Sequence, residues 1–372
     1  MKTLILTGGI FLSLVGSAVN SATAMDGQRV VPMPQAYAPK TAPKAPQIAT
    51  FSIVARDPLT GDYGVAVQSR YFAVGAVVPH AAANTGAVAT QARGNLLYGP
   101  QGLALLERGL AAREVIKQLL ATDPLRDERQ VGVVDRNGQP ASYTGDKCLS
   151  WAGGRTGPGY AVQGNLLAGA QVVDAIATAF EAAPGDFASR LVYALAAGQA
   201  AGGDARGRQS AALLVVRETG GYLGLTDRYI DLHIEDHATP IRELARLLRI
   251  RQSQLASEQA KELVNAAETA TGDRPALLAE ARSLMLDALD KHPSDDYGWW
   301  LLARVHLMQN EPAAAALAAQ RALLENPAWR HLSATNRESL GVSAELLDAL
   351  LQIDSFNRVW TSLAPASETM AK

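Results

Sequence analysis

The sequence predicts an α+β fold in which two layers of mixed or antiparallel sheet lie between helices, followed by an all-helical segment. Between residues 50 and 250, short apolar runs typical of strands alternate with helical spacings, in the order strands, helix, strands, helices, strands, helix. Lys and Glu are rare inside the strand runs, as expected for sheets covered on both faces. After Arg251 the chain is rich in helix formers and has no strand pattern.

The first two strand runs predict a β-hairpin. Residues Ala49 to Asp57 and Gly64 to Arg70 are β-compatible, and the segment between them contains Pro58 and Gly61. The segment before the hairpin has no such pattern, so a folded domain is expected to start abruptly at Thr50.

The following elements are predicted in order along the chain. Asn137-Gly138 is a strong turn signal, which places a second hairpin around it. The glycine-rich segment 151–169 is assigned no element. We expect strands at 73–80, 86–91, 129–134, 141–144, 211–217 and 229–234, and helices at 103–120, 172–180, 187–199 and 240–250.

The N-terminal segment resembles an export signal. Lys2 provides a positive charge, Leu4 to Val19 is largely apolar, and Ala22-Thr23-Ala24 has the form of a signal-peptidase site. We therefore expect a signal peptide over residues 1–24 and a periplasmic or secreted protein, the alternative being an uncleaved membrane anchor. Residues 25–49 contain five prolines, which predicts an extended linker or a pro-segment.

Residues 254–363 are predicted to form an α-helical domain similar to tetratricopeptide repeats. Ala281, Ala288 and Pro293 recur 34 positions later as Ala315, Ala322 and Pro327. About one good and one degenerate repeat are fewer than the roughly three that stabilise such an array, so we expect this domain to pack on the first domain or on a second subunit. Capture of a protein or peptide and a structural or dimerising role are both open.

Composition excludes several classes of function. The formal net charge is -2 and no long Lys/Arg run occurs, which argues against nucleic-acid and anionic-membrane partners. Cys148 is the single cysteine, so intrachain disulfides and zinc sites with several cysteines are excluded. We interpret Cys148 as a buried small residue rather than a reactive thiol.

Thr50 is the first candidate catalytic residue. A threonine hydroxyl is a weak nucleophile, but a free α-amine on the same residue has a pKa of about 8 and can accept the hydroxyl proton. Such a residue must be the first of the mature chain, at the start of a strand that opens into a cleft. The structural alternative is an ordinary threonine in a strand.

Two glycine motifs can supply oxyanion or substrate contacts. Gly94 and Asn95 follow a predicted strand, where a glycine can expose its backbone N–H. Gln163-Gly164-Asn165 can do likewise, with Asn165 as a side-chain donor. Tight turns between close-packed elements are the alternative for both motifs.

Two charged motifs complete the candidates. Asp204 and Arg206, within Gly203 to Arg208, can bind a substrate carboxylate or form an internal ion pair. The segment around His233 can present Asp231, His233 and Glu235 on one strand face, where they can hold a metal. A solvated edge strand is the favoured interpretation of that face, and we predict no metal and no cofactor.

Together these motifs are similar to those of one family. They are Thr50 to Asp57, Gly64 to Val67, Ser69-Arg70, Phe72 to Pro79, Arg129 to Asp135, Trp151 to Gly153, Gln163 to Asn165, Ala201 to Asp204, Arg206 to Ala212, and Asp236-His237. The segment from Thr50 to about Ile250 resembles a bacterial family of unknown function placed in the N-terminal nucleophile (Ntn) hydrolase superfamily.

The resemblance implies a four-layer αββα sandwich with its candidate site at the start of the first strand. It implies Thr50 as nucleophile, Arg70 as a nearby support, and Gly94 as the position most similar to the oxyanion-hole glycine. The sequence departs from proteasome-like members, because Gln68 replaces an acid and no lysine occurs between Lys44 and Lys117.

Three functional hypotheses follow. The first is an exported Ntn-type amidohydrolase that uses Thr50 on a small amide or peptide-like bond. The second is a non-catalytic protein that binds a ligand or partner with this fold and the helical tail. The third makes the tail the functional part. A protein partner through the tail and a homo-oligomer are compatible with each.

Overall fold

The computed structural model describes residues 50–270, 272–332 and 334–363. The predicted signal peptide and proline-rich segment lie outside these residues. Within the described ranges, no helix is both long and apolar enough to cross a membrane.

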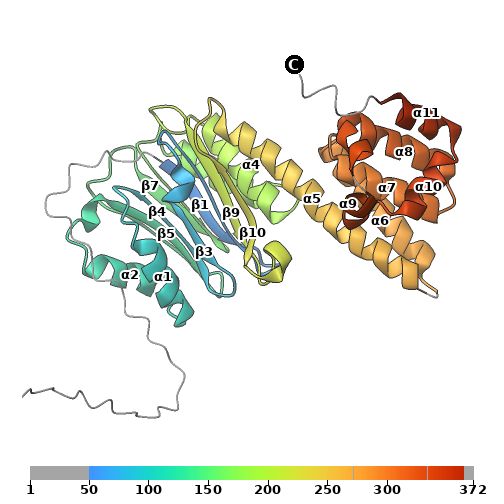
Figure 1. The fold of residues 1–372 in the computed structure, drawn as a ribbon. Coiled ribbons are helices and arrows are strands. Elements are labelled where there is room, and N and C mark those ends of the chain that lie inside the picture. The colour runs from blue at the N-terminus through green and yellow to red at the C-terminus, as the bar shows by residue number, and fades with distance from the viewer. Residues whose placement is uncertain (1–49, 271, 333, 364–372) are drawn as a thin grey trace, which may run out of the picture. The chain divides into compact units, whose positions relative to one another are not determined.

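The strands form two antiparallel sheets (Figure 1). One sheet has six strands in the order β10-β9-β2-β1-β8-β7, and the other has four in the order β3-β4-β5-β6. The strands are β1 Thr50–Arg56, β2 Tyr63–Ser69, β3 Pro79–Ala82, β4 Gly86–Ala92, β5 Arg129–Asp135, β6 Pro140–Thr144, β7 Gly153–Gly157, β8 Tyr160–Asn165, β9 Ser210–Val216 and β10 Arg228–Ile234.

Helices flank the sheets and make up the described chain after β10. They are α1 Tyr98–Glu107, α2 Ala112–Ala121, α3 Gln171–Ala182, α4 Phe187–Ala200, α5 Pro240–Thr269, α6 Arg274–Lys291, α7 Asp296–Met308, α8 Pro312–Glu325, α9 Ala334–Ser339, α10 Ala344–Leu351 and α11 Asp354–Ser362. Short 3-10 turns occur at Val74–Ala76, Arg126–Glu128, Tyr222–Gly224 and Pro327–His331.

Three apolar clusters hold the strand-rich part together. Helices α3, α4 and the first half of α5 cover the six-stranded sheet, with Phe51, Leu191 and Leu244 fully buried among them. Helices α1 and α2 cover the four-stranded sheet around Val115 and Val131. A third cluster, which includes Val54 and Val134, lies where the two sheets face each other. The two sheets therefore enclose a common space, and helices cover the opposite face of each.

Most predicted strands and helices are present, with local differences. A strand was expected at 73–80, but Ala73 has a φ of 54° and begins a 3-10 turn at this point. Only the short β3 follows that turn. The helix expected at 103–120 is two helices, α1 and α2, because the chain turns at Gly109, where φ is 88°. Left-handed backbone interrupts the predicted element in both places.

Strands β7 and β8 were not predicted, because their glycines obscure the alternating pattern. Gly164 has no room for a side chain, since a Cβ there would lie 2.4 Å from a methyl carbon of Leu167. Strand β8 is nevertheless central, because it pairs with β1 along its whole length and brings Asn165 opposite Thr50.

Helix α5 is longer than predicted and contributes to two cores. Its first turns bury Ile241, Leu244 and Leu248 against the six-stranded sheet. Its later turns bury Ala260 and Val264 in a separate helical core. That second core includes Trp300, Trp329 and Phe356, whose rings meet edge to face.

Candidate functional site

Thr50 lies at the start of β1, between two neighbouring strands. It pairs with Ser69 of β2 on one side and with Asn165 of β8 on the other. Its side chain is fully buried, and its hydroxyl donates a hydrogen bond to the Ser69 hydroxyl over 3.1 Å. Since paired residues of an antiparallel sheet share a face, Thr50, Ser69 and Asn165 all point into the space between the sheets.

Next to Thr50, the two sheets enclose a group of polar side chains that we call the amide cluster. Its members are Ser52, Gln91, Gln130, Gln163 and Asn165, each at most 1% exposed. The Ser52 hydroxyl donates to Gln91 Oε1 over 2.6 Å and accepts from Gln163 Nε2 over 2.6 Å. Gln91 Nε2 donates to Gln130 Oε1 over 2.8 Å, and Asn165 Nδ2 donates to the same oxygen over 3.0 Å. The cluster connects β1, β4, β5 and β8.

Backbone carbonyls fix the orientation of these amides. Gln130 Nε2 donates to the carbonyl oxygens of Gly164 and Gly153, over 2.8 and 3.2 Å. Since a carbonyl oxygen can only accept, Gln130 Oε1 must face inward and the amide nitrogens of Gln91 and Asn165 must point toward it. Asn165 Oδ1 is left buried without a protein partner, as is Gln163 Oε1. The cluster thus presents two unused acceptors.

Gly132 of β5 provides the space for the Gln163 side chain. A Cβ at Gly132 would lie 2.0 Å from Gln163 Oε1. The sheets can enclose this amide because the facing strand has no side chain at that level.

Gln68 and Arg70, at the end of β2, do not share the face of Thr50. Gln68 pairs with Phe51 and Ala211, which belong to the helix-covered face of the sheet, and its fully buried amide has no hydrogen-bond partner. Arg70 is exposed, and its guanidinium donates to the Arg206 carbonyl over 3.4 Å.

Asp204 holds the loop between α4 and β9 against this end of the sheet. Its side chain has no solvent exposure and pairs with Arg206 at 3.0 Å. It also accepts the backbone N–H groups of Arg70 and Arg206, over 2.8 and 2.9 Å. The Asp204–Arg206 pair is therefore an internal ion pair that connects the loop to the end of β2.

Gly94 and Asn95 lie in the loop that follows β4. The backbone at Gly94 is close to Gln91 of the amide cluster, since a Cβ built there would lie 3.9 Å from the Gln91 Cα. The Asn95 side chain is used within the protein, because its Oδ1 accepts from the Leu97 N–H and its Nδ2 donates to Asp123. The Gly94 backbone is therefore close to the end of β4, while the Asn95 amide faces Asp123.

Asp123 anchors the same loop. It pairs with Arg129 at 2.8 Å and accepts the Tyr98 hydroxyl over 2.8 Å. Burial alone would raise the pKa of Asp123, but hydrogen bonds from Arg129, the Leu125 N–H, Tyr98 and Asn95 outweigh it and lower that pKa to about 2. The carboxylate is therefore ionised at neutral pH.

The surroundings of Cys148 and His233 indicate structural rather than catalytic roles. Burial raises the pKa of the Cys148 thiol to about 11, which disfavours the reactive thiolate. His233 lies on the edge strand β10, 3.0 Å from Asp231, and that hydrogen bond raises its pKa. Within the described ranges, no group of three or more His, Cys, Asp or Glu side chains is arranged to hold a metal ion.

Sequence reasoning missed Ser52, Gln91 and Gln130 as parts of the site, and it named Gln163 only as a member of the Gln163-Gly164-Asn165 motif. A common signal for these four residues exists, because they are polar residues at inward positions of otherwise apolar strands. The signal can be recognised only when the strands are placed in register and the directions of their side chains are compared.

Comparison with known proteins identifies the family of the strand-rich part. Residues 50–244 match the model of a family of unknown function (DUF1028), and the chain belongs to that family. A crystal structure of a protein from Silicibacter pomeroyi, also described as DUF1028, is 31% identical, with a TM-score of 0.50. That match covers 54% of this chain and 88% of the other chain. A search of curated proteins found no match.

Proposed function

We propose that this member of the family is an exported Ntn-type amidohydrolase that cleaves a small amide or peptide-like bond with Thr50 as nucleophile. The proposal includes the Ntn fold itself, a four-layer αββα sandwich, and cleavage of the chain between Ala49 and Thr50. The observation that carries it is the position of Thr50, at the start of a central strand with its hydroxyl in the polar space between two sheets.

Thr50 and its own amine would carry out the proton transfer. In the uncut chain the Thr50 nitrogen is part of a peptide bond and cannot act as a base. After cleavage, the α-amine accepts the hydroxyl proton as the Thr50 oxygen attacks the substrate carbonyl. The amine of the substrate leaves with a proton, and water then hydrolyses the ester formed on Thr50.

The surroundings of Thr50 can stabilise this reaction. The backbone N–H of Gly94 and the second N–H of Asn165 Nδ2 are the proposed oxyanion donors. The unpartnered Asn165 Oδ1 belongs to a residue directly opposite Thr50, so it can accept an N–H from the released amine. No lysine or metal is used in this scheme, and no cofactor is implied.

The charged residues at the end of β2 are given supporting roles in the proposal. Through its backbone N–H, Arg70 fastens the end of β2 to Asp204, and Arg206 neutralises that carboxylate. We propose that these residues, with Asn95, shape the entrance through which a substrate reaches Thr50.

The mature N-terminus tests the proposal directly. We expect N-terminal sequencing and intact mass of the exported protein to give a chain that starts at Thr50. Thr50→Ala should abolish hydrolysis across a library of small N-acyl amides and short peptides, whereas Thr50→Ser should retain part of it. Thr85→Ala is the control, because Thr85 is a partly buried threonine that also has a hydrogen-bonded hydroxyl but lies in the turn between β3 and β4, outside the amide cluster. A homogeneous mature chain that starts upstream of Thr50 would refute the proposal.

Non-catalytic binding is the second candidate function. It is favoured by Gln68, because an uncharged, buried amide stands where proteasome-like enzymes have an acid. In that case the fold and a tetratricopeptide-like tail would hold a ligand or protein partner. Thr50→Ala would then leave ligand binding unchanged, and the Ala49–Thr50 bond would stay intact.

A further inference from the structure

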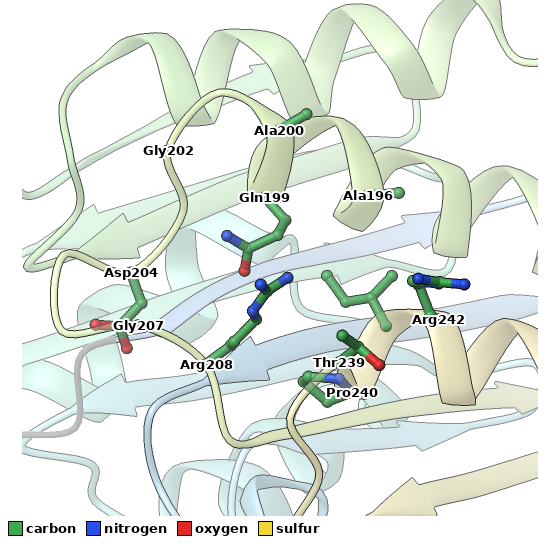
Figure 2. A pocket seen from close by; sticks show the side chains of 11 residues that line it. Ala196, Gln199, Ala200, Gly202, Asp204, Gly207, Arg208, Thr239, Pro240 and Arg242 are labelled. Atoms are coloured by element: carbon green, nitrogen blue, oxygen red, sulfur yellow. The ribbon is translucent and has the colours of Figure 1, made fainter.

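A pocket lies at the junction of α4, the 202–208 loop and the start of α5, on the helix-covered side of the six-stranded sheet. Its volume is about 570 Å³, which suits a small organic ligand. Figure 2 shows Gln199 extending from the end of α4 toward Arg208, with Arg242 on the other side. None of the residues predicted to be catalytic lines it.

Two arginines give the pocket its charge. Arg208 and Arg242 are both exposed, and neither side chain makes a hydrogen bond or ion pair within the described part of the chain. Asp204 also lines the pocket, but its carboxylate is buried and already holds Arg206 and two backbone N–H groups. The two guanidinium groups are therefore available to an anion.

The start of α5 adds to this positive potential. The helix has 30 residues, and Thr239 at its N-cap makes no side-chain capping hydrogen bond. Instead, the Thr239 hydroxyl lies 3.3 Å from His237 Nδ1. Pro240 has no N–H, but the N–H groups of Ile241 and Arg242 have no partner within the helix, and the helix dipole favours negative charge at this end. Glu243 of the same turn is paired with Arg246.

The pocket also has an apolar wall and one unused acceptor. Ala196, Ala200, Pro240 and Ile241 supply the apolar surface. Gln199 lines the pocket, and its Oε1 atom has no hydrogen-bond partner, so a rotation of this side chain would let the oxygen accept an N–H from a ligand. A bare inorganic ion would use neither feature.

We propose that this pocket binds a small organic carboxylate with an apolar group and an amide N–H, such as an N-acyl amino acid. Its carboxylate would pair with Arg208 and Arg242 near the start of α5. Its apolar group would lie on the alanine and isoleucine wall, and its N–H would meet Gln199. The site is separate from Thr50 and does not depend on the proposed hydrolysis.

Calorimetric titration of the full chain tests the proposal with N-acetyl-L-leucine as the probe. N-acetyl-L-leucinamide is the uncharged counterpart, and inorganic phosphate is the anion without an apolar part. We expect the carboxylate to bind most tightly and to weaken at high salt. Arg208→Gln and Arg242→Gln should each weaken binding about tenfold or more, because each removes a charged hydrogen-bond partner.

Arg249→Gln is the matched control, since Arg249 is an exposed, unpaired arginine of the same helix outside the pocket. Both pocket variants replace exposed side chains, so thermal unfolding should match the wild type. Equal binding of the carboxylate and its amide, equal binding of phosphate, no binding at all, or unchanged affinity in both pocket variants would overturn the proposal. Gln199→Leu should lower affinity for N-acetyl-L-leucine but not for isocaproate, which lacks the N–H.

Discussion

The space between the two sheets has a polar half and an apolar half, and the side chains of both halves are buried. The polar half contains Thr50, Ser69 and the amide cluster, whereas the apolar half contains Val54, Val65, Val67, Ala87, Ala89, Val134, Ala161, Ala212 and Leu214. On β1 the change occurs within one face, from Thr50 and Ser52 to Val54.

The change falls at the same level in strands that run in opposite directions. Polar residues therefore occur at the start of β1 and β5 but at the end of β2, β4 and β8. Burying amides is costly unless they are hydrogen-bonded, whereas valine and alanine would fill the space at no such cost. The comparison shows that the polar half buries hydrogen-bonded amides beside Thr50 where apolar side chains would pack at lower cost. Such a departure from simple packing is expected of a functional site.

The largest effect is expected from filling the space that the polar half requires. Gly132→Ala places a Cβ against the buried Gln163 amide and should destabilise the protein by about 3 kcal/mol. Adding Gln163→Ala should relieve this clash, so the double variant should be more stable than the sum of the two single changes indicates. Chemical denaturation of all four proteins measures the coupling, and simple additivity would contradict the proposed clash.

A smaller loss is expected when the hydrogen bonds of the polar half are removed without adding bulk. Gln91→Leu leaves the Ser52 hydroxyl without its acceptor and removes one of the two N–H donors to Gln130 Oε1. It should lower the free energy of unfolding by about 2–3 kcal/mol. Val65→Ala in the apolar half is the matched change, and its cost of about 2 kcal/mol comes from a cavity. Val65→Thr should also destabilise the protein, because it buries a hydroxyl in the apolar half. Chemical denaturation of these variants and of Gln91→Glu compares the effects of polarity and charge in the two halves.

Acid should loosen the loop at the polar end before it affects the apolar half. Because the folded pKa of Asp123 is below its ordinary value of 3.8, this group stabilises the protein above about pH 4 and loses that effect as the pH falls toward 2. The shift corresponds to about 2 kcal/mol. Hydrogen exchange should show residues 92–98 opening in this range, and Asp123→Asn should remove the pH dependence. Equal opening of Val54 and Val65 amides would contradict this difference between the halves.

The smallest effect on stability is expected at Thr50 itself. Thr50→Val keeps the shape and removes the hydrogen bond to Ser69, so it should cost about 1 kcal/mol or less. Hydrolysis should nevertheless be lost completely if Thr50 is the nucleophile. Thermal unfolding combined with activity separates the two roles, and a Thr50→Val protein that still hydrolyses the substrate would exclude the proposed chemistry.

Much of this architecture could be predicted from local pattern. The hairpin after Thr50 and the Asn137-Gly138 turn were identified because alternation and turn residues are local signals. Strand β8 was not identified, because the reason for its Gly164 is a contact that exists only in the folded chain, where Leu167 packs against this glycine.

The candidate site was predictable in the same limited sense. Thr50, Gly94 and Asn165 lie around the amide cluster, and each was marked by its own sequence context. The cluster itself depends on the register between distant strands, so neither Gln91 nor Gln130 has a local signature. The partners of Asn95 and Arg70 likewise depend on loops that meet only in the folded chain.

The order of the six-stranded sheet also has a kinetic consequence. Strand β1 pairs with β2 across a short turn, but its other neighbour, β8, follows about a hundred residues later. Closing such a long loop is slow, so the β1–β2 hairpin can form early while the β1–β8 pairing waits for most of the domain. Asn165 therefore reaches Thr50 late in folding, and partly folded chains would hold Thr50 without the neighbours that the proposed reaction requires.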